Sequence, residues 1–140
     1  MIASRINGYV FVYLLDHPIG HAFASDGGFI LFPDRDTVRA PDFAFIQRDR
    51  LPKVPASFIP MPPDLAVEVL SPTDRLSEAL AKVAMYLEAG VSLVWLIDPR
   101  KRTATVFRQN ELPETVREDG ALDGEEVLPG FTLPLAVLFS

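Results

Sequence analysis

The sequence predicts a domain of the α/β class, and three observations support this expectation. Two short apolar runs, within residues 63–72 and 91–97, have the length and the valine and leucine content of buried strands. The residues between them show the spacing of an amphipathic helix. The chain has 140 residues, of which 49% are hydrophobic and 23% charged, and this balance is typical of one globular domain spanning residues 1–140.

Residues 2–15 are expected to form the first helix, because their apolar residues recur at intervals of three and four. The apolar run at residues 9–15 is too short to cross a membrane, and no signal-peptide cleavage site follows it. The helix either packs wholly on the sheet or forms an oligomer interface. We expect the interface, in a homo-oligomer and most simply a dimer. Its proposed face consists of Ile2, Ile6, Tyr9 and Val10, widened by Phe11, Val12 and Leu15.

Two extended segments and a loop come next. Residues 22–32 are expected to be extended, and residues 38–46 are expected to form a strand. Asp42 lies at the start of the apolar run in this second segment. An aspartate after a proline is common turn chemistry, which is the alternative to a functional role. The prolines of residues 48–63 forbid regular structure through most of that segment. Its first half is basic, so it either borders a polyanion site or is simply solvated, and its cations are Arg48, Arg50 and Lys53.

Glu68 is the unexpected residue of the strand within 63–72. On its own face it is flanked by Ala66 and Leu70, and Val67 and Val69 lie on the other face. A carboxylate that loses its hydration there costs roughly several kcal/mol unless a cation or hydrogen-bond donors meet it. The sequence therefore leaves two readings: an edge strand with Glu68 in water, or a metal ion or lysine beside the carboxylate.

A second helix is expected after this strand. Residues 71–74, Ser-Pro-Thr-Asp, have the cap, proline and acid that favour a helix start, and Gly90 is a natural stop. The expected apolar stripe of this helix consists of Leu76, Ala79, Leu80, Val83, Ala84 and Leu87. Lys82 and Tyr86 lie one turn apart on the flank of this stripe, where most lysines extend to water. Residues 91–97 and 103–108 then predict a β-hairpin with a basic turn, and residues 135–139 a short final helix.

Charge and cysteine content exclude several classes of function. Residues 111–126 hold seven acids and one arginine and so account for the whole net charge of −6. The remaining surface is neutral overall, which argues against strong non-specific binding to nucleic acid. Cysteine is absent, which excludes disulfides, thiolate metal sites and cysteine nucleophiles and fits a cytoplasmic protein.

Three side chains on successive elements can meet at one end of the sheet. They are Asp42, Glu68 and Lys82, on two strands and the following helix. Two carboxylates and a backbone carbonyl suffice to bind a hard divalent cation such as Mg²⁺, which keeps several waters. The lysine can then orient a water or neutralise charge that develops on a phosphate.

At this point the sequence resembles the Uma-type restriction endonucleases, within the PD-(D/E)XK nuclease superfamily. The resemblance covers roughly residues 20–139. The matching segments, in chain order, are Pro41-Asp42, the whole stretch Pro63–Pro72, Lys82 with Tyr86 and Gly90, Val94–Pro99 and Leu128–Phe131. The ordered set is far more specific than any one of its members.

The resemblance implies a restriction-endonuclease-like core, with a mixed β-sheet flanked by helices, and a phosphodiesterase site for Mg²⁺ or Mn²⁺. Asp42 would be the aspartate of the PD motif, Glu68 the acid of the second motif, and Val69 would offer its carbonyl to the metal. The position two after Glu68 is Leu70 rather than lysine. In this family the lysine is thought to have moved to the next helix, where Lys82 fits and Arg75 is the weaker substitute.

The resemblance also implies that the domain is shortened at its N-terminus, because members usually carry some tens of residues before the first helix. An acidic ligand from that region is then missing. The first hypothesis is a metal-dependent DNA endonuclease, with Arg48, Arg50 and Lys53 binding the DNA backbone. The second is a catalytically degenerate interaction or regulatory module. A third, a carboxylate-pair hydrolase such as a glycosidase, lacks an aromatic platform for sugar beyond Trp95.

Overall fold

The computed structural model describes residues 1–140 and is built on a six-stranded mixed sheet in the order β1-β4-β5-β6-β7-β8. Its strands are β1 (Gly20–Ala24), β4 (Phe43–Gln47), β5 (Leu65–Val69), β6 (Leu93–Asp98), β7 (Thr103–Arg108) and β8 (Glu114–Val116). Only β5 and β6 are parallel, and every other neighbouring pair is antiparallel. The predicted hairpin of residues 91–97 and 103–108 is confirmed as the β6–β7 pair.

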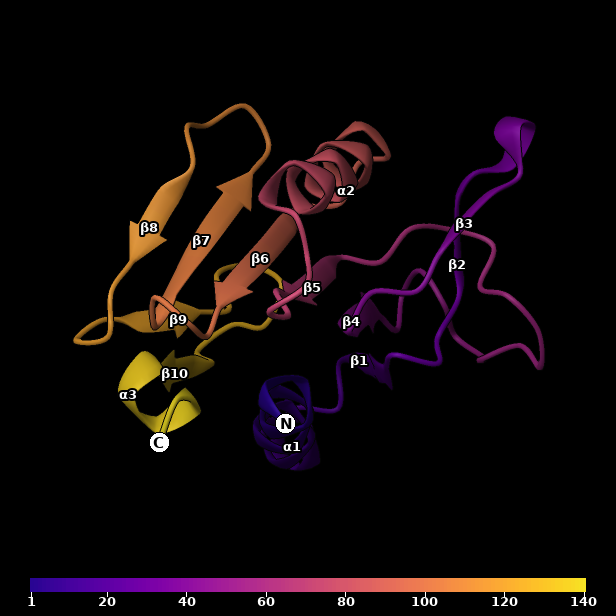
Figure 1. Ribbon diagram of the computed structural model, residues 1–140. Helices are drawn as coiled ribbons and strands as arrows, with labels where there is room; N and C mark the ends of the chain where they lie inside the picture. Colours follow the sequence, from indigo (N-terminus) through magenta and orange to yellow (C-terminus); the bar gives the residue numbers. More distant parts are fainter.

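Helices cover both faces of this sheet (Figure 1). The crossover helix α2 (Leu76–Glu88) lies on one face, whereas α1 (Ile2–Asp16) and the short α3 (Leu135–Leu138) lie on the other. Each face therefore has its own core, of 19 buried residues beneath α1 and α3 and of 14 beneath α2. Trp95 is buried in the first core and Tyr86 in the second. The predicted α/β class with a mixed sheet flanked by helices is confirmed.

Two small two-stranded sheets complete the fold. A hairpin of β2 (Phe29–Phe32) and β3 (Thr37–Arg39), joined by the 3₁₀ turn η1 (Pro33–Arg35), projects at the side of the molecule away from β8 (Figure 1). The other pair, β9 (Ala121–Asp123) with β10 (Thr132–Pro134), lies beside α3. The single strand expected over residues 38–46 is wrong. It divides into β3 and β4 at Ala40-Pro41, because proline has no N–H for a ladder.

The helix α2 begins later than its sequence predicts. Residues 71–74 form a turn, in which Asp74 Oδ2 accepts the N–H of Ser71 at 2.8 Å, and the helix starts at Leu76. The buried face of α2 consists of Ala79, Val83 and Tyr86. Two leucines of the expected apolar stripe, Leu76 and Leu80, are 54% and 41% exposed. The helix is therefore rotated so that Tyr86, rather than these leucines, enters the core.

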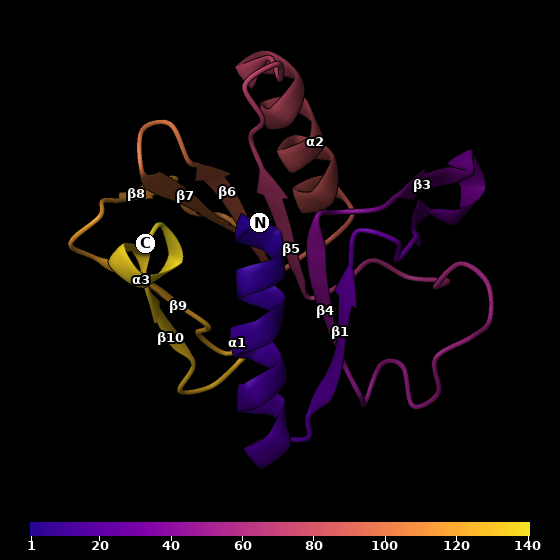
Figure 2. The ribbon, with the colours of Figure 1, turned by 60° about the horizontal axis from the view of Figure 1, so that its bottom comes forward.

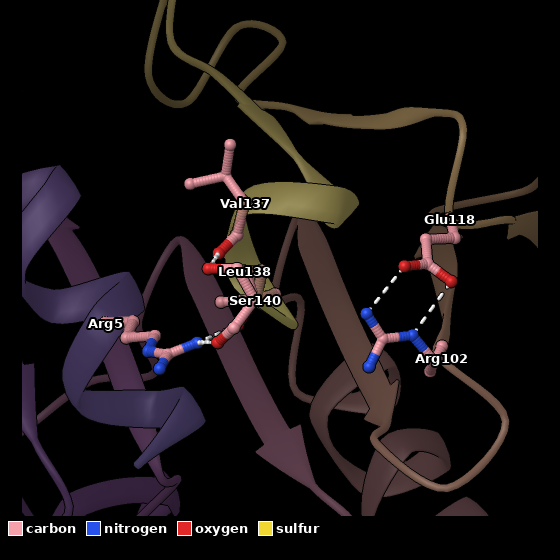
Figure 3. A network of polar contacts seen from close by, with 6 residues as sticks. All are labelled: Arg5, Arg102, Glu118, Val137, Leu138 and Ser140. Carbon is pink, nitrogen blue, oxygen red and sulfur yellow. Dashed lines mark hydrogen bonds and ion pairs between the residues drawn. The ribbon is translucent and has the colours of Figure 1, made fainter.

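The acidic segment folds back on the basic residues of β7 and its turn. Arg108 of β7 binds both Glu114 and Glu125, at 2.9 and 2.7 Å, so β7 joins β8 to the segment that follows β9. Arg102 binds Glu118 through two hydrogen bonds (Figure 3). Three of the seven acids of residues 111–126 are thus paired locally rather than left as a free acidic tail.

The first helix is joined to the end of the chain. The guanidinium of Arg5 donates to the carbonyl of Leu138 at 2.9 Å and to the carbonyl of Ser140 (Figure 3). Figure 2 shows α1 running across the sheet next to α3. None of the helices combines the length and the apolar character that a membrane crossing requires.

Candidate active site

The aspartate and the glutamate meet across the β4–β5 pair. Phe43 of β4 is paired with Val67 of β5, and continuing this antiparallel register by one position sets Asp42 opposite Glu68. Directly opposed residues project from the same face of a sheet, with Cβ atoms about 5 Å apart. The Asp42 Oδ2 atom also accepts the backbone N–H of Val69 at 2.7 Å. This bond holds the start of β4 against the end of β5.

Glu68 is buried in the middle of the sheet. Its strand β5 has neighbours on both sides, and the residue is only 8% exposed, so the edge-strand reading of the sequence is wrong. The phenol of Tyr86 donates to Glu68 Oε2 at 2.6 Å. The ammonium of Lys82 lies 3.8 Å from Glu68 Oε1, and its side chain is 52% exposed. The ammonium therefore reaches the glutamate, as expected, while it remains open to solvent and to a substrate.

The charge of Glu68 is only partly compensated. Burial raises the pKa of Glu68 above the ordinary glutamate value, and the nearby charge of Asp42 raises it further. The hydrogen bond from Tyr86 and the charge of Lys82 act in the opposite direction but do not restore the ordinary pKa. The pKa of Tyr86 is itself raised, first by burial and then by Glu68. The phenol therefore stays protonated and serves as a fixed donor to the carboxylate.

The oxygen atoms of this pair fit a hard divalent cation. No group of three or more histidine, cysteine, aspartate or glutamate side chains is arranged to hold a metal ion. The two-carboxylate arrangement is nevertheless suitable, because Mg²⁺ keeps several waters and needs few protein ligands. Asp42 Oδ1 makes no hydrogen bond within the chain. A cation beside it would also offset the uncompensated charge that raises the pKa of Glu68.

A small cavity of about 40 Å³ opens beside Glu68. This leaves room for water, since one molecule needs about 10–15 Å³ of such a cavity. It is lined on one side by Glu68 and Val69 of β5 and on the other by Glu78 and Lys82 of α2. Arg75 also lines it, but this side chain is 81% exposed and lies 3.9 Å from Glu78 rather than beside Glu68. The structure therefore sets Lys82, and not Arg75, at the acid pair.

The three cations of the proline-rich loop are not brought to this site. Asp42 precedes β4, whereas Arg48 follows its far end, and six residues of extended chain span about 20 Å. Arg50 is engaged at that far end, where it binds Asp64 at 2.9 Å and the carbonyl of Pro62 at 2.9 Å. Arg48 and Lys53 are exposed there. The structure gives these three residues no contact with the acid pair.

Comparison with known proteins identifies the family. The family described as "Uma2: Putative restriction endonuclease" matches residues 2–136 of the chain. The chain belongs to this Uma2 family. Its fold is similar to that of a crystal structure described as a putative nuclease belonging to DUF820, from Anabaena variabilis, with a TM-score of 0.87. The two sequences are 23% identical, and the match covers 99% of this chain and 78% of the other. No curated protein sequence matches this one.

Tyr86 is the residue of this candidate site to which the sequence assigns no role. It lies one helical turn from Lys82, and four-residue spacing does place two side chains on one helix face. What the pattern did not show is the rotation of α2, which buries Tyr86 to 1% exposure and leaves Lys82 half in solvent. The two residues thus approach opposite oxygens of the same carboxylate.

Proposed function

We propose that this chain is a metal-dependent DNA endonuclease that hydrolyses phosphodiester bonds. Membership of the Uma2 family and the nuclease-like fold support a nuclease-like function. The observation that carries the finer proposal is the Glu68 carboxylate, which is buried, incompletely neutralised and approached by a solvent-open lysine at 3.8 Å. Buried acids with perturbed pKa values beside a lysine are typical of catalytic sites.

Asp42 and Glu68 would hold Mg²⁺ or Mn²⁺, with the backbone carbonyl of Val69 as a further ligand. When bound, the metal would polarise a phosphoryl oxygen and lower the pKa of a bound water. Lys82 would hold that water or place its positive charge beside the developing phosphate charge, since its ammonium is both near Glu68 and exposed. Tyr86 would keep the carboxylate of Glu68 in one orientation, leaving Oε1 toward Lys82.

One observation favours a second candidate, a catalytically degenerate interaction or regulatory module. No third acidic, histidine or cysteine side chain joins the acid pair in an arrangement that could hold a metal ion. If two carboxylates bind the metal too weakly at cellular concentrations, the fold would persist because its two cores still pack. Such a module would keep the sheet and the helices but lack metal-dependent cleavage.

Supercoiled plasmid separates the two candidates. The endonuclease should nick or linearise it with Mg²⁺ or Mn²⁺ and not with EDTA, and Glu68→Gln and Asp42→Asn should each abolish cleavage. Glu88→Gln, which changes an exposed carboxylate near the other end of α2, is the matched control and should cut normally. Cleavage that survives Glu68→Gln would contradict this site. Absence of both cleavage and Mn²⁺ binding in the unaltered chain would favour the second candidate.

We further propose that the chain forms a homodimer through the outer face of α1. The expected face was partly wrong, because Ile6 and Val10 are fully buried against the chain's own sheet. The outer residues remain exposed at 45–67%, and they are Tyr9, Phe11, Val12 and Leu15. An exposed apolar surface of this kind is commonly a contact surface for another protein. Sedimentation should give a dimer that Phe11→Glu with Leu15→Glu converts to a monomer, and a monomeric unaltered chain would contradict the proposal.

A further inference from the structure

A wide crevice lies at the carboxyl ends of the two parallel strands, β5 and β6. Its volume is about 530 Å³, more than ten times that of the cavity beside Glu68. Open sheets commonly bind ligands outside the carboxyl ends of parallel strands. The residues that follow β5 form one wall, and the turn after β6 forms the other. They are Leu70, Ser71, Pro72, Asp74 and Leu76 on the first side and Asp98, Pro99, Arg100 and Lys101 on the second.

The crevice holds two cations that no acid pairs, although it contains as many acids as bases. Asp74 accepts the N–H of Ser71 at 2.8 Å, and Asp98 accepts the N–H groups of Arg100 and Lys101 at 3.1 and 3.2 Å. Both carboxylates are therefore engaged in shaping their own turns. Arg100 and Lys101, in contrast, are exposed and take part in none of the seven ion pairs of the chain. Their charges are available to an anionic ligand.

The turn that carries these two cations is held in one shape. Asp98 caps its first half, and Arg102, in the left-handed conformation at φ 55°, closes it. Arg102 is in turn fixed to Glu118 by hydrogen bonds of 2.8 and 2.6 Å (Figure 3). A ligand that binds such a turn loses little binding energy to ordering the protein.

The crevice adjoins the acid pair. Leu70 and Asp74 line both this crevice and the cavity beside Glu68 and Lys82. In the parallel register Glu68 is level with Leu96, so Arg100 lies four residues further along the neighbouring strand. Along the strand direction this offset is roughly 13 Å at most, or about four steps of 3.4 Å along one strand of a duplex.

We propose that the turn Asp98–Arg102 is the nucleic-acid clamp of this chain, with Arg100 and Lys101 binding backbone phosphates within about four nucleotides of the one held at Asp42 and Glu68. The inference rests on the proposed nuclease function and assigns its substrate-binding surface. It moves that surface from the loop containing Arg48 and Lys53 to the turn that borders the acid pair. Phosphate contacts of this kind position the substrate without reading its sequence.

The test measures binding of a fluorescein-labelled DNA duplex by fluorescence anisotropy. EDTA is present so that cleavage cannot interfere. Arg100→Glu with Lys101→Glu should weaken the Kd at least tenfold. The milder pair Arg100→Gln and Lys101→Gln should lower the slope of log Kd against log salt by about two, at roughly 0.9 per phosphate contact. The matched charge control is Arg35→Glu with Arg117→Glu, two exposed cations outside the crevice, and it should bind within about twofold.

The outcomes separate this inference from the proposed nuclease function. If Arg48→Glu with Lys53→Glu abolishes binding while the Arg100 and Lys101 variants bind normally, the clamp is overturned and cleavage by the unaltered chain still stands. If the unaltered chain binds DNA through Arg100 and Lys101 but never cuts it, the clamp stands and the nuclease proposal falls. An unaltered chain that binds no duplex even at low salt overturns the clamp. Thermal melting of each variant verifies that it is folded.

Discussion

The two ends of β5 each carry a buried carboxylate, and the two are treated differently. Asp64 directly precedes the strand and Glu68 lies near its end, and both are 8% exposed. Asp64 accepts the backbone N–H of Gln47 at 2.7 Å and binds the guanidinium of Arg50 at 2.9 Å. Glu68 has one neutral donor, the phenol of Tyr86, and an ammonium at 3.8 Å that remains half in solvent.

The comparison shows that burial of an acid does not by itself identify a functional site. The charge of Asp64 is compensated by short, charge-assisted contacts that join β4, β5 and the proline-rich loop. Its role is therefore structural. Glu68 is left with a raised pKa and a spare capacity for a cation. An acid that the fold buries without full compensation is the one to associate with chemistry.

The largest effect on stability is expected from Asp64→Ala. This change leaves the N–H of Gln47 without its acceptor and removes the partner of Arg50, and breaking such a buried pair costs about 3 kcal/mol. Urea denaturation should show this loss, whereas cleavage by the folded fraction should persist. A loss below about 1 kcal/mol would show that Asp64 does not have this structural role.

Lys82→Ala should have the opposite effects, with little loss of stability and a large loss of cleavage activity. Its ion pair with Glu68 is half exposed, so the free energy of unfolding should change by less than about 1 kcal/mol. Metal-dependent cleavage should fall on the order of 10²-fold, because one charge-stabilising group is lost. Single-turnover cleavage rates measure this effect, and Lys82→Arg should recover part of it. Full activity in Lys82→Ala would show that another cation, such as Arg75, stabilises the developing charge.

Glu68→Gln should stabilise the fold while it removes metal binding. The substitution keeps the shape and an acceptor for Tyr86 but deletes a buried, incompletely paired charge, so a gain of about 1 kcal/mol is expected at neutral pH. Denaturant unfolding measures the gain, and Mn²⁺ titration measures the loss of binding. Reduced stability in this variant would mean that Tyr86 and Lys82 fully compensate the charge of Glu68.

The smallest effect is a pH dependence of that same gain. The folded-state pKa of Glu68 is raised, so the folded chain binds its proton more tightly than the unfolded chain does. Stability from this group is full below the ordinary glutamate pKa and is lost as the pH rises through the raised value. The difference between the unaltered chain and Glu68→Gln should therefore be largest at neutral pH and shrink as the pH falls toward 4. A constant difference across that range would contradict the raised pKa.

Much of the sheet could be predicted from sequence, because its signals are local. The β6–β7 hairpin and the strand around Glu68 are visible in the sequence as short apolar runs. Strands form at these positions, as predicted. The start of α2 was predicted too early, because Ser71 and Asp74 are equally suited to cap a helix and to close a turn. Local pattern does not distinguish these two uses.

The partners of the acids could not be predicted, since they depend on which strands become neighbours. Nothing near Arg50 indicates that it will bind Asp64 instead of a substrate, as both residues lie in or beside an irregular loop. The compensation of Glu68 depends on the rotation of α2, which packing against the sheet decides. The sequence shows which groups are available, and the topology decides which of them meet.

The contact between Arg5 and Leu138 has a consequence during synthesis of the chain. These residues are 133 positions apart, so α1 emerges from the ribosome long before its C-terminal partner exists. At about 5–20 residues per second that interval lasts roughly 7–27 s. During the first half of this interval, until β4 and β5 have been made, the inner side chains Ile6 and Val10 lack the sheet that later buries them completely. The nascent chain thus carries an uncovered apolar helix until these strands emerge, and the contact of α1 with α3 forms last.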